Sequence, residues 1–158
     1  MLWLQVDAAA VKRALAGKFK DKAASAIASD PSLYTEIINS SSYEKSLRLV
    51  ISYGNLKRSQ FLDALQERLE PRLVKAGEKG TLDAFKQLFD DVSFKKGSEV
   101  VFVQEGGKLV TKVDGKAKGS IASPALCGAL FDVYLGSDPV APEAKASFGR
   151  TIASVLKE

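Results

Sequence analysis

The side chains that most often perform catalysis or bind metals are scarce in this 158-residue sequence. Histidine, the commonest general base and metal ligand, is absent, and Cys127 is the single cysteine. Cys127 follows Leu126 in an apolar stretch, which predicts a packed and unreactive thiol. The adjacent Asp90 and Asp91 are expected to be solvated, because a metal site needs convergent ligands from other segments. The sequence therefore predicts no catalytic residue, no metal and no cofactor.

The charged residues favour neither a nucleic-acid nor a membrane partner. The net charge is +4, but the basic residues are dispersed along the chain, and no apolar run approaches the roughly 20 residues of a membrane helix. Lys112, Lys116 and Lys118 are expected to form the solvated edge of a hairpin, where lysines prevent aggregation. Arg48 alternates with apolar residues in a predicted strand. It could bind a ligand carboxylate, but contact with solvent or with an internal carboxylate is the preferred interpretation.

Hydrophobic periodicity and turn residues predict the elements that position these side chains. Asp114-Gly115 and the glycines at 106–107 mark tight turns of a three-stranded meander, Ser123 is a predicted N-cap, and Gly136 is predicted to end the following helix in the left-handed conformation. Strands are predicted at 2–6, 43–53 (the longest), 100–104, 108–113 and 116–121, and helices at 8–16, 21–28, 31–39, 57–76 (kinked or split at Pro71), from Thr81, at 124–135 and from Pro142. We predict a single α+β domain over residues 1–158, an antiparallel β-sheet with helices packed on one face.

Several segments resemble the chalcone isomerase family, most closely its non-catalytic, fatty-acid-binding branch in plants and algae. They are YEKSLRL at 43–49, FKKGSEVVFV at 94–103 and, most specifically, SPALCGALFDVYLGSDPVAPEAK at 123–145. The resemblance implies an antiparallel sheet backed by helices with a ligand cleft between them. In that family a hairpin precedes the strand that Leu2–Val6 resembles, and it carries an arginine that contacts the ligand. We therefore expect an N-terminally truncated version of the fold in which Leu2–Val6 is an edge strand.

The resemblance also implies which residues line the cleft. Ile51 stands where isomerases have a lysine, Phe61 replaces a tyrosine, and Arg68 replaces an asparagine. Cys127 and Gly128 replace a small hydroxyl residue and its neighbour. Largely apolar or small side chains thus stand in for polar groups that would bind a flavonoid. Ordinary core packing of Ile51, Phe61 and Cys127 is the alternative interpretation.

These expectations combine into a functional hypothesis with two alternatives. The chain is expected to bind a fatty acid or a similar amphipathic small molecule in an apolar cleft without catalysis, with Arg68 or Arg48 as candidate partners of the carboxylate. One alternative is a chalcone–flavanone isomerase, an intramolecular lyase that stabilises an attacking phenolate. The other is an accessory protein that modulates a partner enzyme. A homodimer could form through the exposed sheet edge. The resemblance suggests a location in the plastid; without the resemblance, a cytoplasmic location is expected.

Overall fold

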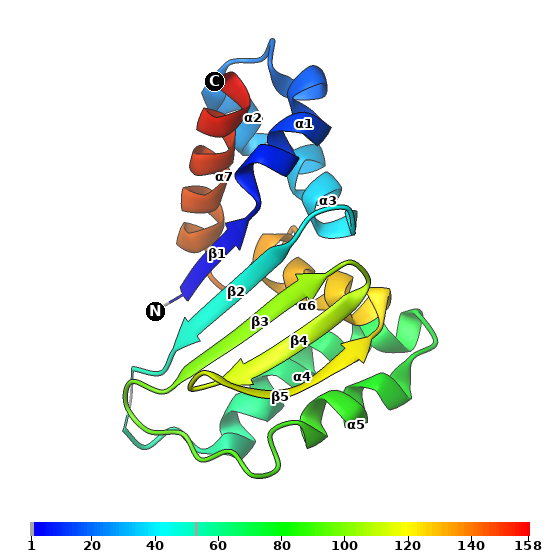
Figure 1. Ribbon diagram of the computed structural model, residues 1–158, viewed down its shortest axis with the longest axis vertical. Helices are drawn as coiled ribbons and strands as arrows, with labels where there is room; N and C mark the ends of the chain where they lie inside the picture. The colour runs from blue at the N-terminus through cyan, green and yellow to red at the C-terminus, as the bar shows by residue number, and fades with distance from the viewer. Residues whose placement is uncertain (1, 53) are drawn as a thin grey trace.

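The five strands form one open antiparallel sheet. The computed structural model describes residues 2–52 and 54–158. The strands lie side by side in chain order, β1-β2-β3-β4-β5, and each pairs antiparallel with its neighbour (Figure 1). Their bounds are β1 Leu2–Val6, β2 Lys45–Val50, β3 Glu99–Glu105, β4 Lys108–Val113 and β5 Lys116–Ala122. The predicted sheet is confirmed, and β1 is an edge strand as expected.

The helices form two groups around this sheet. They are α1 Ala8–Phe19, α2 Ala24–Ser29, α3 Pro31–Asn39, α4 Arg58–Lys75, α5 Lys79–Gln87, α6 Pro124–Leu135 and α7 Pro142–Lys157. Helices α4, α5 and α6 cover one face of the sheet, which confirms the predicted fold class (Figure 1). Helices α1, α2, α3 and α7 gather beyond the end of the strands, with α7 beside β1. None of the helices described over residues 2–52 and 54–158 is both long and apolar enough to cross a membrane.

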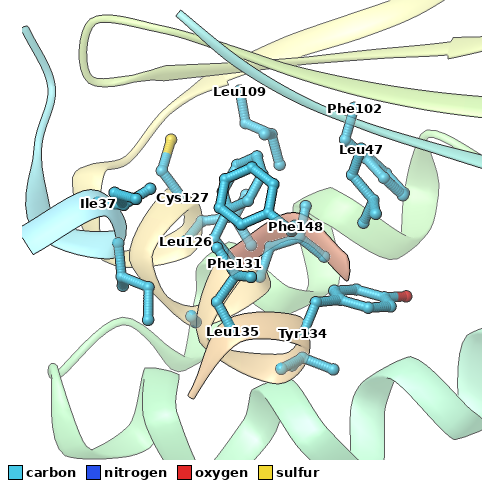
Figure 2. Close-up of a cluster of buried hydrophobic side chains, with 14 of the residues drawn as sticks. Ile37, Leu47, Phe102, Leu109, Leu126, Cys127, Phe131, Tyr134, Leu135 and Phe148 are labelled. Carbon is cyan, nitrogen blue, oxygen red and sulfur yellow. The ribbon is translucent and has the colours of Figure 1, made fainter. Parts of the chain in front are cut away.

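Helix α6 lies at the centre of the core, between the sheet and α4. Figure 2 shows Leu126 and Phe131 of α6 directed towards Leu47, Phe102 and Leu109 of the sheet. All five of these side chains are at most 1% exposed. A helix that is apolar on nearly all sides is stable only where protein surrounds it, so the sequence of α6 dictates its central position.

Local turn and capping chemistry accounts for the meander and for the start of α6. Asp114 and Gly115 have φ values of 51° and 81°, the left-handed conformation that a two-residue hairpin turn requires. The Ser123 hydroxyl oxygen accepts a hydrogen bond from the backbone N–H of Leu126 at 3.0 Å, and Pro124 is the first helical residue. These predicted features are confirmed.

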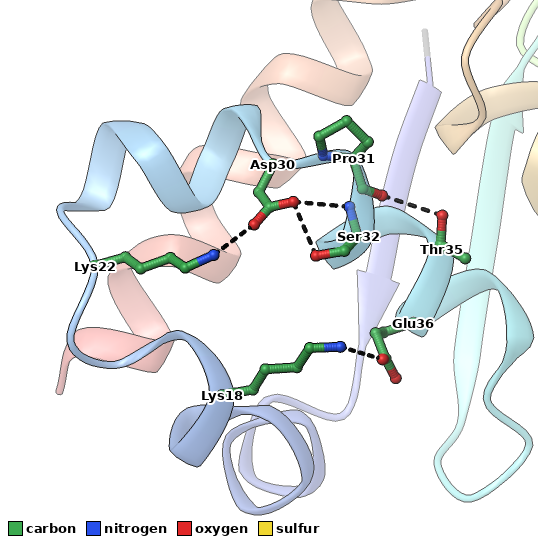
Figure 3. A network of polar contacts seen from close by, with 7 residues as sticks. All are labelled: Lys18, Lys22, Asp30, Pro31, Ser32, Thr35 and Glu36. Carbon is green, nitrogen blue, oxygen red and sulfur yellow. Dashed lines mark hydrogen bonds and ion pairs between the residues drawn. The ribbon is translucent and has the colours of Figure 1, made fainter.

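The connection between α2 and α3 is fixed by a polar network, shown in Figure 3. The Asp30 carboxylate accepts hydrogen bonds from the backbone N–H of Ser32 at 2.9 Å and from the Lys22 ammonium at 2.8 Å. Lys18 of α1 forms an ion pair with Glu36 of α3 at 2.6 Å. Asp30 therefore caps α3 and links it to the segment that follows α1.

Some predicted bounds are wrong because tertiary packing overrides local signals. Strand β2 is shorter than the predicted 43–53 and is not the longest strand, and Tyr53 lies outside the described residues. Pro71 does not split α4, because Leu69 and Leu73 on either side of it are fully buried. Helix α1 continues past Gly17, since the fully buried Phe19 extends its apolar stripe by another turn.

Two predicted helix ends have a different basis from the one expected. Gly136 ends α6 with φ −74° and ψ −169°, which is extended backbone and not the left-handed conformation. Glycine is required there by crowding, because a Cβ atom would lie 2.5 Å from the backbone oxygen of Asp132. Thr81 does not cap α5, which begins at Lys79. The Thr81 hydroxyl instead donates a hydrogen bond to the Glu78 carboxylate at 3.1 Å.

Candidate functional site

An apolar cleft opens where β2 ends and α4 begins. It has a volume of about 320 Å³, and its lining residues are Leu2, Leu49, Val50, Ile51, Ser52, Leu56 and Phe61. Strand β1 contributes Leu2, β2 contributes Leu49 and Val50, the segment between β2 and α4 contributes Ile51, Ser52 and Leu56, and the first turn of α4 contributes Phe61. The structure thus brings together Ile51 and Phe61, two of the residues expected to line a ligand cleft.

Ile51 is held in place by the two residues that precede β3. Its backbone N–H donates to the Ser98 carbonyl at 2.9 Å, and its carbonyl accepts from the Gly97 N–H at 2.9 Å. The side chain is 7% exposed. These hydrogen bonds extend the β2–β3 pairing beyond the end of β2, so Ile51 forms a fixed part of the cleft wall.

Phe61 forms the aromatic wall of the apolar cleft. Its ring centroid lies 4.9 Å from that of Phe94 and 5.6 Å from that of Phe89, both in tilted arrangements. Phe89 in turn contacts Phe85 and Phe102 of the core at 5.7 and 6.3 Å. Aromatic pairs favour such non-parallel arrangements over direct face-to-face stacking. The cleft wall is therefore continuous with the aromatic core.

The local sequence explains why Leu56 and Phe61 meet in this cleft. Lys57 is the N-cap residue of α4, so Leu56 and Phe61 occupy the two positions of a hydrophobic staple. The Gln60 side chain accepts a hydrogen bond from the backbone N–H of Lys57 at 2.9 Å, as the third residue of a capping box does. The segment LKRSQF therefore encodes both the start of α4 and one side of the cleft, a signal that the sequence analysis missed.

Neither arginine considered as a carboxylate partner lines the apolar cleft. Arg68 donates to the Asp138 carbonyl at 2.9 Å and lies 3.5 Å from its carboxylate, in the loop after α6. Arg48 is exposed, forms an ion pair with Glu99 at 2.7 Å and stacks 4.6 Å from the Trp3 ring. The expected contact of Arg48 with an internal carboxylate is confirmed. Among the described residues, none that lines the cleft is ionisable.

Cys127 and Gly128 lie in α6, away from the lining of this cleft. Cys127 is fully buried, and Figure 2 shows it near Ile37 and Leu109. Burial raises the pKa of its thiol to about 11. Gly128 is half-buried, and a Cβ atom there would meet nothing within 4 Å. Cys127 is thus an inert core residue in this structure, in accord with the packing interpretation of the sequence.

A second, polar cleft adjoins the apolar one at the start of α4. Its volume is about 610 Å³, and its lining residues are Gly54, Asn55, Leu56, Lys57, Arg58, Ser59 and the segment 90–94. Arg58 donates to the backbone carbonyls of Phe89 and Asp90, which fixes the two sides of this cleft relative to each other. The Asp91 side chain is exposed, as expected, and it also forms an ion pair with Lys118 at 3.2 Å. Within the described residues, no group of three or more Cys, Asp or Glu side chains is placed to hold a metal ion.

Comparison with known proteins identifies relatives over nearly the whole chain. Residues 6–148 match the family described as chalcone isomerase-like. The chain is 31% identical over 157 residues to fatty-acid-binding protein 2 of Arabidopsis thaliana, a match that covers 96% of this chain and 39% of that protein. It is 28% identical over 168 residues to a chalcone–flavanone isomerase of Hordeum vulgare, covering 99% of this chain and 71% of the isomerase.

The fold comparison agrees with the sequence comparison. The crystal structure of a fatty-acid-binding protein of Arabidopsis thaliana superposes with a TM-score of 0.88 at 26% sequence identity. The match covers 99% of this chain and 79% of that structure. The chain therefore has the architecture of that protein, although it spans only 39% of the length of the first relative named above.

Proposed function

The chain belongs to the chalcone isomerase-like family, and on that premise we propose that it binds a fatty acid or a similar amphipathic small molecule in the apolar cleft. The observation that carries the proposal is the lining of this cleft, in which Ile51 and Phe61 meet and no described residue is ionisable. Each methylene that leaves water for such a lining contributes about 0.8 kcal/mol. The volume of about 320 Å³ lies within the range of roughly 300–1,000 Å³ typical of small-molecule sites.

We propose further that the chain is not a chalcone–flavanone isomerase. Relatives named as fatty-acid-binding proteins and as isomerases match at nearly equal identity, 31% and 28%, so the lining residues must decide between the two functions. Cyclisation through an attacking phenolate needs a donor or cation aimed at the charged oxygen. The hydroxyl of Ser52 is the one side-chain polar group among the described lining residues, and no described cation accompanies it.

Ligand identification tests the proposed function directly. Native mass spectrometry of the purified protein, followed by organic extraction, should identify a bound fatty acid, and added fatty acid should displace a fluorescent fatty-acid analogue. Phe61→Gln should weaken this binding at least about tenfold, equivalent to roughly 1.4 kcal/mol, because it places an amide in the apolar wall. The control is Val74→Gln, which introduces the same side chain at a 52% exposed position of the same helix.

Distinct outcomes contradict distinct parts of the proposal. A protein that carries no lipid and leaves added fatty acid unbound would exclude the binding function. Conversion of chalcone to flavanone by the purified protein would exclude the non-catalytic assignment. Equal loss of binding in Phe61→Gln and Val74→Gln, with both variants folded by circular dichroism, would place the ligand elsewhere.

The free edge of β1 supports a second proposal, that two copies pair through this strand. The sequence LWLQV of β1 contains no charged residue or proline, features that commonly protect sheet edges. A groove of about 460 Å³, lined by β1 and by residues 144–155 of α7, runs along this edge. Antiparallel pairing about Leu4 would place Trp3 opposite Gln5 of the second copy.

Light scattering after size-exclusion chromatography tests this pairing. The expected result is a dimer that Gln5→Lys converts to a monomer, because a charge on an exposed edge position opposes pairing. A monomer at the highest soluble concentration would contradict the dimer. The edge would then remain available to a different protein, as the accessory-protein alternative requires.

A further inference from the structure

The apolar and polar clefts meet at Leu56. Leu56 lines both clefts, and Phe61 of the apolar cleft is in ring contact with Phe94 of the polar cleft at 4.9 Å. The lining therefore changes from aliphatic and aromatic side chains to charged ones over consecutive residues, from Leu56 to Lys57 and Arg58. A molecule with an apolar chain and a charged end matches this order of surfaces.

The cations near this junction differ in whether they already have partners. Arg58 is engaged by the carbonyls of Phe89 and Asp90, and Lys118 is paired with Asp91. The ammonium of Lys57, in contrast, makes no hydrogen bond or ion pair with any residue in 2–52 or 54–158, and the residue is exposed. Lys57 is thus the cation of the polar cleft that is available to a ligand.

The charged side chains that line the polar cleft carry a net positive charge that one anion would balance. The cations are Lys57 and Arg58, and the carboxylates are Asp90 and Asp91. Because Lys118 neutralises Asp91, the remaining groups carry one net positive charge. Among the described residues, Asp90 forms no ion pair with Lys57, so the ammonium is not neutralised within the cleft. A single carboxylate would balance the site.

We propose that Lys57 binds the carboxylate of a ligand whose hydrocarbon chain occupies the apolar cleft. This inference rests on the function proposed above and assigns the polar end of that ligand. Lys57 takes the role of carboxylate partner that the sequence had suggested for Arg48 or Arg68. Those two arginines line neither cleft and are paired with Glu99 and Asp138, respectively. A charge-assisted hydrogen bond from the ammonium orients the ligand, so the carboxylate lies at the solvent-exposed rim and the chain lies inside.

The site predicts discrimination between a fatty acid and the corresponding alcohol. An exposed ion pair contributes little affinity, so we expect Lys57→Met to weaken binding of hexadecanoic acid about three- to tenfold. Binding of hexadecanol should not change, because it carries no charge. Raising the salt concentration should weaken binding of the acid to the wild type and should have no effect on the alcohol.

Competition against a fluorescent fatty-acid analogue measures all of these affinities on the same protein. Lys75→Met is the matched control, because it removes an exposed lysine from the opposite end of α4. The proposal is supported if only Lys57→Met loses affinity and only for the acid. It is overturned if Lys57→Met binds the acid as the wild type does, or loses acid and alcohol equally. If the wild type binds neither compound, the proposed function fails as well, which separates the two results.

Discussion

Replacing the buried Lys45 by methionine separates two opposing effects of its ammonium group. Lys45 lies in β2 and is 1% exposed. Its ammonium donates to the carbonyls of Ile37, Ile38 and Ser40 at 2.6, 3.1 and 2.9 Å, and it lies 5.2 Å from the centre of the Phe131 ring. These carbonyls belong to the end of α3, where intrahelical donors are lacking. Lys45 therefore caps α3 from inside the core.

The magnitudes of the two effects follow from this geometry. Burial lowers the pKa of Lys45 from 10.5 to about 8, which corresponds to about 3 kcal/mol against the charged form in the folded chain. Methionine removes this cost but leaves the two buried carbonyls of Ile37 and Ile38 without the ammonium donor, at about 1.5 kcal/mol each, whereas the Ser40 carbonyl keeps a hydrogen bond from the Gln104 amide at 3.4 Å. Below pH 8 we therefore expect Lys45→Met to change the free energy of unfolding by no more than about 1 kcal/mol.

The two effects separate as the pH rises. Between about 8 and 10.5 the unfolded chain holds a proton at Lys45 that the folded chain has lost. Stability of the wild type therefore rises with pH in this window, by up to about 1.4 kcal/mol per unit. Above 10.5 the cost of the charge has disappeared and only the carbonyl bonds remain. There, Lys45→Met should be about 3 kcal/mol less stable than the wild type.

Guanidinium unfolding across this pH range measures the difference between wild type and variant, so that other titrating groups cancel. Lys112→Met, at an exposed position of β4, is the control and should show no pH-dependent difference. The reasoning is refuted if the difference between wild type and Lys45→Met is independent of pH. That result would mean that the three carbonyls fully compensate the ammonium for its burial.

Three further predictions concern capping and burial. The hydrogen bond from Lys22 lowers the pKa of Asp30 from its ordinary 3.8 to about 2, so the stability contributed by this carboxylate is present above pH 3.8 and is lost as the pH falls towards 2. In acid unfolding, Asp30→Asn should therefore lose less stability between about pH 4 and pH 2 than the wild type does. Equal losses of stability would contradict this role of Asp30. Ser123→Ala should lower the free energy of unfolding by about 1 kcal/mol in urea, and an unchanged midpoint would show that its N-cap bond is dispensable. Because burial raises the pKa of the Cys127 thiol to about 11, a disulfide reagent should label it slowly in the folded protein and rapidly after denaturation, and rapid native labelling would disprove its burial.

The meander of β3, β4 and β5 could be predicted because its determinants are local. Asp114-Gly115 specifies the hairpin turn between β4 and β5 by conformational preference alone, although the alternating pattern did not reveal the register irregularity between Thr111 and Lys112. Ser123 and Pro124 specify the start of α6 in the same way. That Pro71 would not split α4 could not be predicted, because this depends on the burial of the leucines around it, which the flanking segment does not reveal.

The candidate site was only partly predictable, because it also depends on contacts between segments that are far apart in the sequence. Ile51 and Phe61 could be identified as neighbours through the family resemblance. The direction of the Arg68 side chain depends on Asp138, which is 70 residues further along the chain, and that of Arg48 on Glu99. The polar cleft is formed by two segments, 54–59 and 90–94, whose proximity no periodicity encodes.

The position of charge relative to the apolar cleft distinguishes the functions considered for this family. An isomerase must stabilise a developing oxyanion where water is excluded, so its cation has to lie inside the cleft with the reacting atoms. A fatty-acid site has the opposite requirement, because a carboxylate at the rim stays partly hydrated and only the chain must be buried. In this chain the described lining is uncharged, and the available cation, Lys57, lies in the adjoining polar cleft. Moving a cation inside, as in Ile51→Lys, would therefore oppose binding of the hydrocarbon chain while supplying one element that cyclisation needs.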